Sequence, residues 1–294
     1  MFLYDRDPRG HRADDNPAPM TPNPRQAELL EAVRTQGALR VEALAERFGV
    51  TLQTVRRDVK LLTAAGLLSR FHGGVRAPAS TTENLAYLQR QAMNAEGKQR
   101  LARAAAAAVP DHCSLFINLG TTTECVARAL LQHRGLRVIT NHLNVAATLS
   151  ANPDFEVIVT GGVVRGRDHG VVGEAAVAFV RQFRVDIGLI GISGIEEDGS
   201  LRDYDFREIQ VARAIIESSR EVWLCADASK FHRPAMVELA RLDQVDRVFT
   251  DAPPPDPFPA MLADAGVDLV VAGPAREAGP APAPSAPLAP RNAE

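Results

Sequence analysis

The side chains best suited to binding a polyanion stand close together in the first quarter of the 294-residue chain. They are Thr51, Gln53, Thr54, Arg56, Arg57 and Lys60. Amide and guanidinium groups can pair with base edges in the major groove of DNA, whereas an ammonium group is suited to a phosphate. Adjacent helical residues diverge by about 100°, so the sequence leaves open which of Arg56 and Arg57 faces bases and whether the other contacts phosphate or Asp58. The set predicts a surface that reads DNA.

A helix must hold these side chains on one face. Thr51 is suited to begin it, because a threonine hydroxyl can accept a hydrogen bond from the free backbone N–H groups of the first turn. Val55, Val59 and Leu62 recur at helical spacing on another side. The pattern predicts a helix that packs its apolar side inward and presents its basic side to a DNA groove.

Short segments around this helix complete a small module. Helices are expected from Pro24 and over Val41–Phe48, and Gly49 can adopt the left-handed conformation that ends the second one. Two extended runs flank His72–Gly74 and predict a hairpin. Three helices and a hairpin indicate a winged helix-turn-helix over residues 21–78.

Positive charge supports a DNA-binding role for this module. Residues 21–79 carry nine Lys/Arg and five Asp/Glu, whereas residues 80–294 carry 21 Lys/Arg and 27 Asp/Glu. Contacts to the DNA backbone orient a protein without reading sequence. The backbone contacts expected here are Lys60, Arg70, His72 and Arg76. A helical module that uses its basic face only for solubility is the alternative.

Small and hydroxyl residues follow an apolar, strand-like run in the C-terminal part of the chain. Gly120, Thr121, Thr122 and Thr123 lie between Ser114–Leu119 and a predicted helix. Glycine lets backbone N–H groups approach an anion, and hydroxyls and the helix N-terminus add further donors. The segment predicts a phosphate-binding loop, and an ordinary helix-capping turn is the alternative.

Other small or polar residues also follow strand-like runs, so they could meet at the same edge of a parallel sheet. They are Asn141, Gly162, Arg165, Gly191 and Lys230. Lys230 and Arg165 could neutralise a phosphate, whereas solvated loop cations are the alternative for both. The set predicts an effector-binding crevice.

Strand-like runs alternate with helices over residues 96–273, which predicts a mostly parallel sheet covered on both faces. The expected fold class is α/β, with the winged helix-turn-helix followed by this larger domain. Residues 79–95 are expected to form a hinge. Residues 1–20 and 274–294 lack an apolar period, which predicts a disordered leader and a disordered Pro/Ala-rich tail. Met20 is an alternative start of the chain.

Composition argues against several other classes of protein. No stretch approaches eighteen consecutive apolar residues, so we expect no membrane span. The N-terminus lacks the apolar core of a signal peptide. The three cysteines are widely spaced and the seven histidines show no metal-ligand spacing, so we expect no disulfide, no metal and no cofactor. A reduced cytoplasm is the expected location.

Two sets of motifs resemble a known family. Gly49–Lys60 together with Leu67–Arg76 resembles the signature region of the DeoR-type bacterial repressors. The likeness covers about residues 24–260 and, within the family, narrows to the branch that regulates glycerol 3-phosphate metabolism. The further matching segments are Thr140–Ala146, Gly170–Ala175, Gln182–Arg184, Gly191–Ile195, Arg213–Glu217, Ser229–Phe231 and Thr250–Pro255.

The resemblance implies a DNA-binding transcriptional repressor that a phosphorylated sugar or polyol releases from its operator, with glycerol 3-phosphate as the expected effector. It implies a sensor domain with a fold related to ribose-5-phosphate isomerase and the CoA transferases, and a homo-oligomer, either a dimer or a tetramer. It places phosphate contacts at Gly120–Thr123. It places polar effector contacts at Asn141, Arg165, Asp205 and Lys230.

Alternative functions remain open at this point. An isomerase-like enzyme would need a carboxylate base, but no catalytic spacing identifies one and an appended DNA module favours sensing, so we expect no enzyme. The carboxylates available are Glu174, Asp186, Asp205 and Glu208. A regulator of a different sugar-phosphate pathway is the other alternative, because Asn118 and Ala212 stand where the family has Asp and often has Lys. Repression and activation share this anatomy, so the sequence does not separate them.

Overall fold

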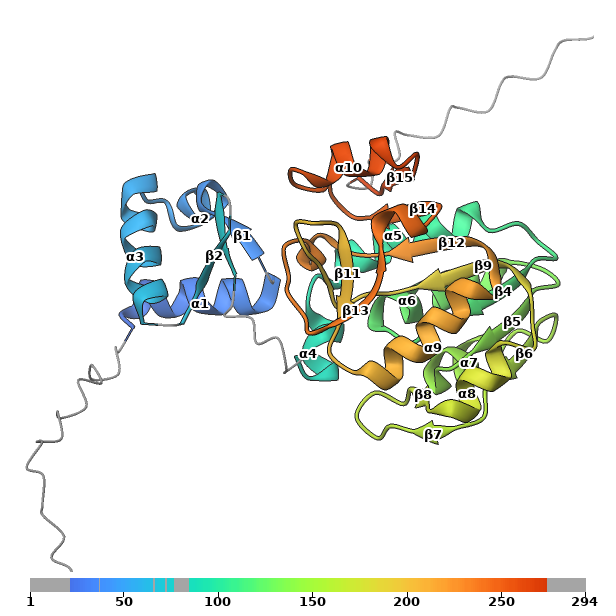
Figure 1. Ribbon diagram of the computed structural model, residues 1–294. Helices are drawn as coiled ribbons and strands as arrows, with labels where there is room; N and C mark the ends of the chain where they lie inside the picture. Colours follow the sequence, from blue (N-terminus) through green and yellow to red (C-terminus); the bar gives the residue numbers. More distant parts are fainter. Residues whose placement is uncertain (1–21, 37, 66, 72, 77–84, 274–294) are drawn as a thin grey trace, which may run out of the picture.

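The computed structural model describes residues 22–36, 38–65, 67–71, 73–76 and 85–273, so the predicted leader, the predicted tail and the first part of the hinge, residues 79–84, lie outside it. The first unit comprises α1 Pro24–Gln36, β1 Ala38–Arg40, α2 Val41–Phe48, α3 Leu52–Ala64, β2 Ser69–Phe71 and β3 Gly74–Arg76. Its strands form an antiparallel sheet in the order β1-β3-β2. Three helices with this hairpin confirm the winged helix-turn-helix (Figure 1).

Local chemistry sets the turn that leads into α3. Gly49 ends α2 with a φ of 61°, a left-handed conformation that glycine adopts readily. Thr51 begins α3, and its hydroxyl accepts a hydrogen bond from the backbone N–H of Thr54 at 3.3 Å, as predicted for the N-cap. Val55 and Val59 are buried, so α3 turns its polar side outward.

The second unit is built on a seven-stranded sheet in the order β15-β14-β12-β9-β4-β5-β6, and every neighbouring pair is parallel. The strands are β4 Ser114–Ile117, β5 Arg137–Thr140, β6 Glu156–Val159, β9 Val185–Ile190, β12 Ser219–Cys225, β14 Arg247–Thr250 and β15 Asp268–Val271. The central strands bury apolar side chains on both faces, as a covered parallel sheet requires.

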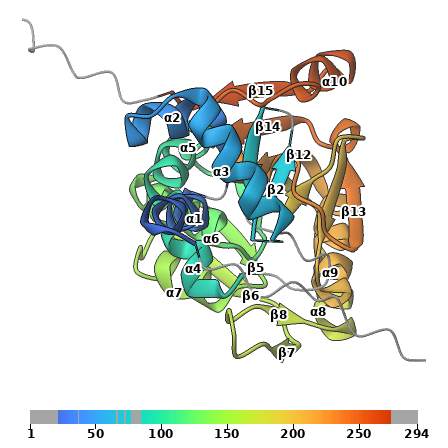
Figure 2. The ribbon, with the colours of Figure 1, turned by 90° about the vertical axis from the view of Figure 1, so that its left-hand side faces the viewer.

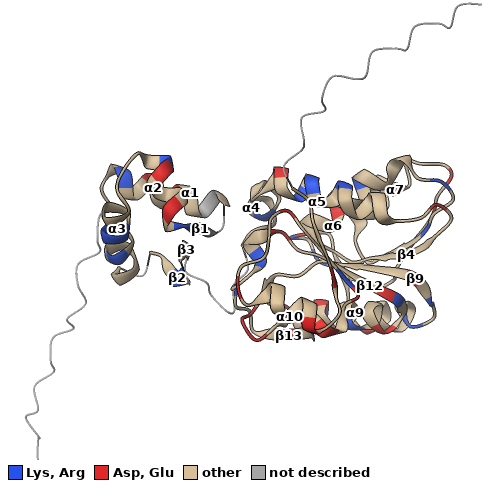
Figure 3. Cartoon of the chain, turned by 90° about the horizontal axis from the view of Figure 1, so that it is seen from above, with Lys and Arg blue, Asp and Glu red and all other residues tan. Residues whose placement is uncertain are grey.

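Helices cover both faces of this sheet, as the sequence predicts (Figure 3). One face packs against α5 Ala95–Ala108, α6 Thr121–Ala129 and α7 Leu143–Leu149. The other packs against α8 Glu174–Val180, α9 Phe206–Glu217 and α10 Phe258–Asp264, and against an antiparallel sheet of β10 Gly194–Ile195, β11 Ser200–Asp203 and β13 Val237–Arg241. The remaining elements are α4 Tyr87–Ala92, the pair β7 Val163–Val164 and β8 Val171–Val172, and 3-10 turns at Leu130–Gln132, Ala228–Lys230 and Leu242–Gln244.

The two units turn different sides to each other. In Figure 1, α3 lies on the side of the winged unit that points away from the second unit, and in Figure 2 it faces the viewer. The helix α4 lies on the side of the second unit that faces the winged unit. Among the described residues, no helix is long and apolar enough to cross a membrane, and no group of three or more His, Cys, Asp or Glu is arranged to hold a metal ion.

Candidate nucleic-acid interface and sensor site

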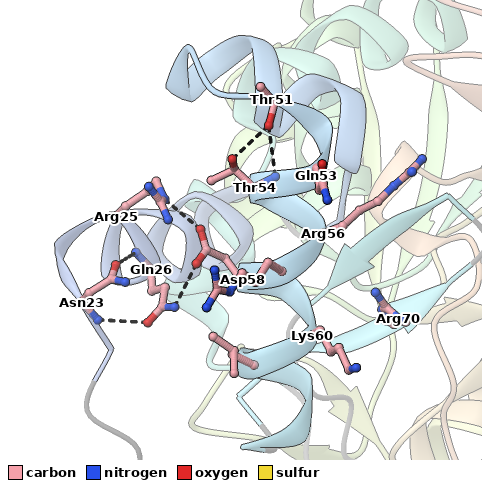
Figure 4. A pocket seen from close by; sticks show the side chains of 12 residues that line it. Asn23, Arg25, Gln26, Thr51, Gln53, Thr54, Arg56, Asp58, Lys60 and Arg70 are labelled. Carbon is pink, nitrogen blue, oxygen red and sulfur yellow. Dashed lines mark hydrogen bonds and ion pairs between the residues drawn. The ribbon is translucent and has the colours of Figure 1, made fainter.

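A groove of about 760 Å³ runs along α3 (Figure 4). Five of its lining side chains are cationic and one is acidic, which gives the lining a net charge of +4. A concave basic surface of this kind attracts a polyanion. The lining residues are Asn23, Arg25, Gln26, Thr51, Gln53, Thr54, Arg56, Arg57, Asp58, Lys60, Leu61 and Arg70.

Most of the DNA contacts predicted from the sequence meet in this groove. They are Thr51, Gln53, Thr54, Arg56, Arg57, Lys60 and Arg70. Arg56, Arg57 and Lys60 are exposed and form no ion pair with another described residue, so their charges are available to a ligand. The predicted contact at His72 lies outside the described residues.

The partners of Asp58 answer one question that the sequence left open, namely whether Arg56 or Arg57 pairs with this carboxylate. Its carboxylate accepts from Arg25 Nε at 2.7 Å and from Gln26 Nε2 at 3.0 Å, both on α1. Burial alone would raise the pKa of Asp58, but the hydrogen bonds from Arg25 and Gln26 hold it below its ordinary value. Among the described residues, no hydrogen bond or ion pair joins Arg56 or Arg57 to Asp58, although the charge of Arg57 also lowers the pKa of Asp58.

The hairpin turns one of its sides to the second unit. Arg76 does not line the groove; burial lowers its pKa, and the charges of Glu197 and Tyr204 act on its guanidinium. Phe71 stacks on His232, with ring centroids 5.9 Å apart and ring planes 22° apart. The hairpin residue expected at a phosphate therefore lies at a contact between the two units.

The Gly120–Thr123 segment forms the buried first turn of α6. Gly120 has a φ of 152°, and its carbonyl accepts from Thr123 Oγ1 at 2.8 Å. Thr121 Oγ1 donates to the carbonyl of Arg90 at 3.5 Å. Within the described residues, no side chain caps the free N–H groups of this turn, contrary to the simpler interpretation, and the turn lies beside a cationic residue of α4.

Arg165 is the centre of a buried ion-pair cluster. Its guanidinium donates to Asp168 at 2.7 and 3.1 Å, to Asp205 at 3.0 Å and to Glu208 at 2.8 Å. Burial alone would lower the pKa of Arg165, and Glu208 and Asp168 raise it above its ordinary value. Burial and Asp203 raise the pKa of Glu208 to about 8. The cluster brings together two predicted effector contacts, Arg165 and Asp205, but it already engages the donors of Arg165.

Lys230 lies in a second group of buried charges. It is 6% exposed, and burial lowers its pKa to about 7, against the attraction of Asp227. The like charges of Lys98 and Arg90 also act on it. Arg90 Nη2 lies 3.6 Å from Asp168 Oδ2 of the Arg165 cluster. Because the charge of Arg90 also acts on Lys230, Arg90 links the two groups electrostatically. Thr121 therefore contacts α4 directly, Arg165 is linked to α4 through Asp168, and the charge of Arg90 on α4 acts on Lys230.

Asn141 and Gly162 have supporting positions in the same region. Asn141 is fully buried; its Oδ1 accepts from the backbone N–H of Leu119 at 3.2 Å, and its Nδ2 donates to the carbonyl of Val171 at 3.2 Å. It thus fixes the residue before Gly120. A Cβ added to Gly162 would lie 2.7 Å from the carbonyl oxygen of Val172, so this glycine permits a close backbone approach.

A buried polar network ties α4 to α6. Glu124 is 3% exposed, and its carboxylate accepts from Tyr87 Oη at 2.5 Å and from Asn144 Nδ2 at 3.1 Å. His142 Nε2 lies 3.2 Å from the same carboxylate. Burial raises the pKa of Tyr87 above its ordinary value, so the phenol stays a proton donor. The helix within the predicted hinge, α4, is therefore bonded to the helix that begins with the threonine loop, α6.

Sequence reasoning did not identify Arg90 and Lys98 as part of this site. Lys98 is 1% exposed and donates to the carbonyls of Arg90 and Met93, at 2.7 Å for the latter. Within the described residues, Nε of Arg90 is buried without a hydrogen-bond partner. A lysine on the apolar side of the Ala-rich helix α5, at the spacing of Leu101 and Ala105, was the available signal.

The carboxylates considered for an enzyme do not meet in one place. Asp205 and Glu208 both bond to Arg165. Asp186 instead accepts from Ser114 Oγ at 2.6 Å, and Glu174 lies in the exposed first turn of α8. The four side chains therefore form no common acid–base site.

Two family descriptions match the chain. The "DeoR-like helix-turn-helix domain" matches residues 25–81. The "DeoR C terminal sensor domain" matches residues 93–252, which is more than half of the chain. The two matches correspond to the winged unit and to the second unit.

Several known proteins align along most of their length. The glycerol-3-phosphate regulon repressor of Escherichia coli (strain K12) is 47% identical over 241 residues, which are 82% of this chain and 95% of that protein. The protein of the same name from Haemophilus influenzae is 46% identical over 226 residues, which are 77% and 88% of the two chains. The HTH-type transcriptional repressor CsqR of Escherichia coli (strain K12) is 40% identical over 252 residues, which are 86% and 96%.

Solved structures show a weaker likeness. Ribose 5-phosphate isomerase A from Methanocaldococcus jannaschii has a TM-score of 0.35 and 16% identity, and the match covers 47% of this chain and 55% of that chain.

Proposed function

Because the chain belongs to the DeoR family of transcriptional repressors, we propose that it binds operator DNA through the α3 groove and that a phosphorylated sugar or polyol releases it. Glycerol 3-phosphate is the proposed effector, because the relatives that are 47% and 46% identical are both glycerol-3-phosphate regulon repressors. The proposal includes a homo-oligomer, a dimer or a tetramer, that works in the cytoplasm. It also includes the boundaries 21–78 for the DNA-binding domain, 79–95 for the hinge and 96–273 for the sensor domain.

The groove along α3 is the single observation that carries the DNA-binding half. Arg56 and Arg57 stand exposed on a helix whose other side is buried, and neither is neutralised by Asp58. A guanidinium in this position can form a two-pronged contact with guanine, worth about 1–3 kcal/mol. Lys60 and Arg70 of the same groove add charge for phosphates.

Buried positive charge around α4 supports the effector half of the proposal. Arg90, Lys98 and Lys230 act on one another electrostatically in a region that excludes most water. A phosphate beside the first turn of α6 would relieve this repulsion and gain the hydroxyl and backbone donors of Thr121–Thr123. Buried cations attract a phosphate more strongly than solvated ones do.

Two connections lead from this region to the winged unit. Tyr87 and Arg90 belong to α4, which lies within the proposed hinge, so an effector that moves α4 moves the hinge itself. His232 follows Lys230 by two residues and stacks on Phe71 of β2. An effector need only prefer the released arrangement by about 1–3 kcal/mol to weaken operator binding 5–150-fold.

Fluorescence anisotropy tests this function with a labelled operator that the full-length chain selects from random DNA. Titrated glycerol 3-phosphate is expected to weaken operator binding 5–150-fold, whereas glycerol and inorganic phosphate should do less. Unchanged operator affinity at millimolar glycerol 3-phosphate would contradict the assignment of this effector. If the chain selects no DNA sequence, the proposed DNA-binding function is wrong.

We also expect the sensor domain to bind its effector without converting it chemically. Incubation of the full-length chain with glycerol 3-phosphate and with pentose phosphates, followed by chromatography of the products, should return the substrates unchanged. Measurable conversion would favour the isomerase-like alternative.

A further inference from the structure

The first turn of α1 forms one wall of the groove, although the sequence pattern points to α3 alone. Arg25 and Gln26 lie 33 and 32 residues before Asp58 in the chain, and all three line the same groove. Figure 4 shows Arg25 and Gln26 reaching from α1 toward the carboxylate of Asp58 on α3. Arg25 is therefore one of the five cations of the groove, and α1 contributes it beside the cations of α3.

The Asp58 carboxylate is held in a fixed position. Its side chain is 5% exposed, and it accepts from Arg25 Nε at 2.7 Å and from Gln26 Nε2 at 3.0 Å. The amide of Gln26 is fixed in turn, because its Oε1 accepts from the backbone N–H of Asn23 at 3.0 Å. Asn23 Oδ1 accepts from the backbone N–H of Gln26 at 2.9 Å, which closes the ring of contacts.

Arg25 is only partly used by this network. Its side chain is 40% exposed, and the bond to Asp58 engages Nε. Within the described residues, no hydrogen bond or ion pair engages either of its Nη groups. The two Nη groups of an arginine can bind phosphate oxygens in a fork. The guanidinium thus has one edge anchored on α3 and donors left for a phosphate in the groove.

The charge of Asp58 also needs an explanation. A carboxylate at the edge of the groove would repel phosphates, and burying it between α1 and α3 is costly unless it is paired. Pairing with Arg25 removes the repulsion and fixes the angle at which the arginine approaches the groove. A brace between two helices would not need a cation that is 40% exposed.

We propose that Arg25 is a phosphate contact of the DNA interface and that Asp58 positions it, so that the interface extends from α3 onto α1. This inference rests on the DNA-binding function proposed above. Arg25 contributes affinity and fixes the angle of the module on the duplex, while base reading stays with α3.

Salt dependence of DNA binding separates a phosphate contact from a structural brace. In Arg25→Gln the shorter amide can still donate to Asp58, but the charge is lost. The affinity of the full-length variant for a labelled mixed-sequence duplex is measured over a series of salt concentrations. Loss of one phosphate contact should lower the slope of log affinity against log salt by about 0.9 and weaken binding roughly tenfold at about 0.1 M salt. Arg103→Gln, an exposed change on α5 with the same loss of charge, should leave the slope unchanged.

The positioning role of Asp58 is tested by a double-mutant cycle. Asp58→Asn should weaken binding in the wild-type background and have much less effect in the Arg25→Gln background, since it acts through Arg25. Equal effects in both backgrounds would overturn the positioning role. An Arg25→Gln slope equal to that of the wild type would overturn the phosphate contact while leaving DNA binding intact. Absence of binding by the wild-type chain would overturn both this inference and the proposed function.

Discussion

The groove along α3, which we propose reads DNA, and the buried charges around Arg165 and Lys230, the proposed effector crevice, both gather positive charge but balance it in opposite ways. In the groove, Arg56 and Arg57 are exposed, and the lining has a net charge of +4. In the crevice, Arg165 has a 7% exposed side chain bonded to three carboxylates, and Lys230 is buried beside Asp227. An exposed, unbalanced surface is ready for a large polyanion and is weakened by salt. A buried cluster whose cations are already paired with carboxylates must rearrange these ion pairs to bind a small anion. Binding of the anion is therefore coupled to a change of conformation.

The largest effect is expected at the balanced region. Arg165→Met leaves Asp168, Asp205 and Glu208 without their shared cation, so the free energy of unfolding should fall by about 3–5 kcal/mol. Urea unfolding of the full-length chain measures it. Arg181→Met is the matched control, because its pair with Glu217 is about 60% exposed on both sides; it should cost less than about 1 kcal/mol. Equal costs would contradict the contrast between buried and exposed charge.

At the unbalanced region, replacing both Arg56 and Arg57 with Ala should abolish specific operator binding. Two lost base contacts at about 1–3 kcal/mol each predict a loss of operator affinity of roughly 30-fold or more. Because neither residue holds a partner in the fold, thermal unfolding and glycerol 3-phosphate binding should stay close to those of the wild type. Retained operator affinity would show that α3 is not the reading helix.

A change of pH should act on the crevice and spare the groove. Burial lowers the pKa of Lys230 from 10.5 to about 7, so the unfolded chain binds more protons between these values. The contribution of Lys230 to stability therefore rises with pH in this window. Effector binding needs the ammonium form, so the effector dissociation constant should rise about tenfold per unit above pH 7.

Isothermal titration calorimetry from pH 7 to pH 9 checks this dependence, since a phosphate monoester with a second pKa of about 6 stays dianionic there. Lys230→Gln should bind weakly and show no such dependence. A wild-type affinity that does not change with pH would remove Lys230 from the effector site.

The smallest effect is expected at the cap of α3. Thr51→Ala removes the hydroxyl that accepts from the backbone N–H of Thr54, which should cost about 1 kcal/mol of stability. Thr51→Ser keeps this hydroxyl and should restore most of the loss in a thermal-unfolding measurement. A loss that Ser does not restore would show that the methyl group, and not the cap, matters.

In both regions, the sequence predicted those features whose pattern lies within a few neighbouring residues. The helix from Thr51 follows from a cap, an apolar repeat and a glycine before it, all within one turn or two. The Gly120–Thr123 loop follows from an apolar run that precedes small residues. The strand and helix alternation likewise predicted a parallel sheet covered on both faces, which the structure confirms.

The features that sequence reasoning missed depend on contacts between distant segments. Arg25 meets Asp58 across 33 residues, and nothing near either one indicates the pairing. Arg90 and Lys98 look like solvated helical cations in the sequence, but the fold buries Lys98 and places Arg90 between Asp168 and Lys230.

The central claim is that the two regions are coupled, and thermodynamic reciprocity tests it most directly. Calorimetry gives the affinity of the full-length chain for glycerol 3-phosphate in the absence of DNA and in the presence of saturating selected operator. The account predicts that operator weakens effector binding by the same factor, within about 5–150-fold, by which effector weakens operator binding. An effector affinity that is identical with and without operator would contradict the account.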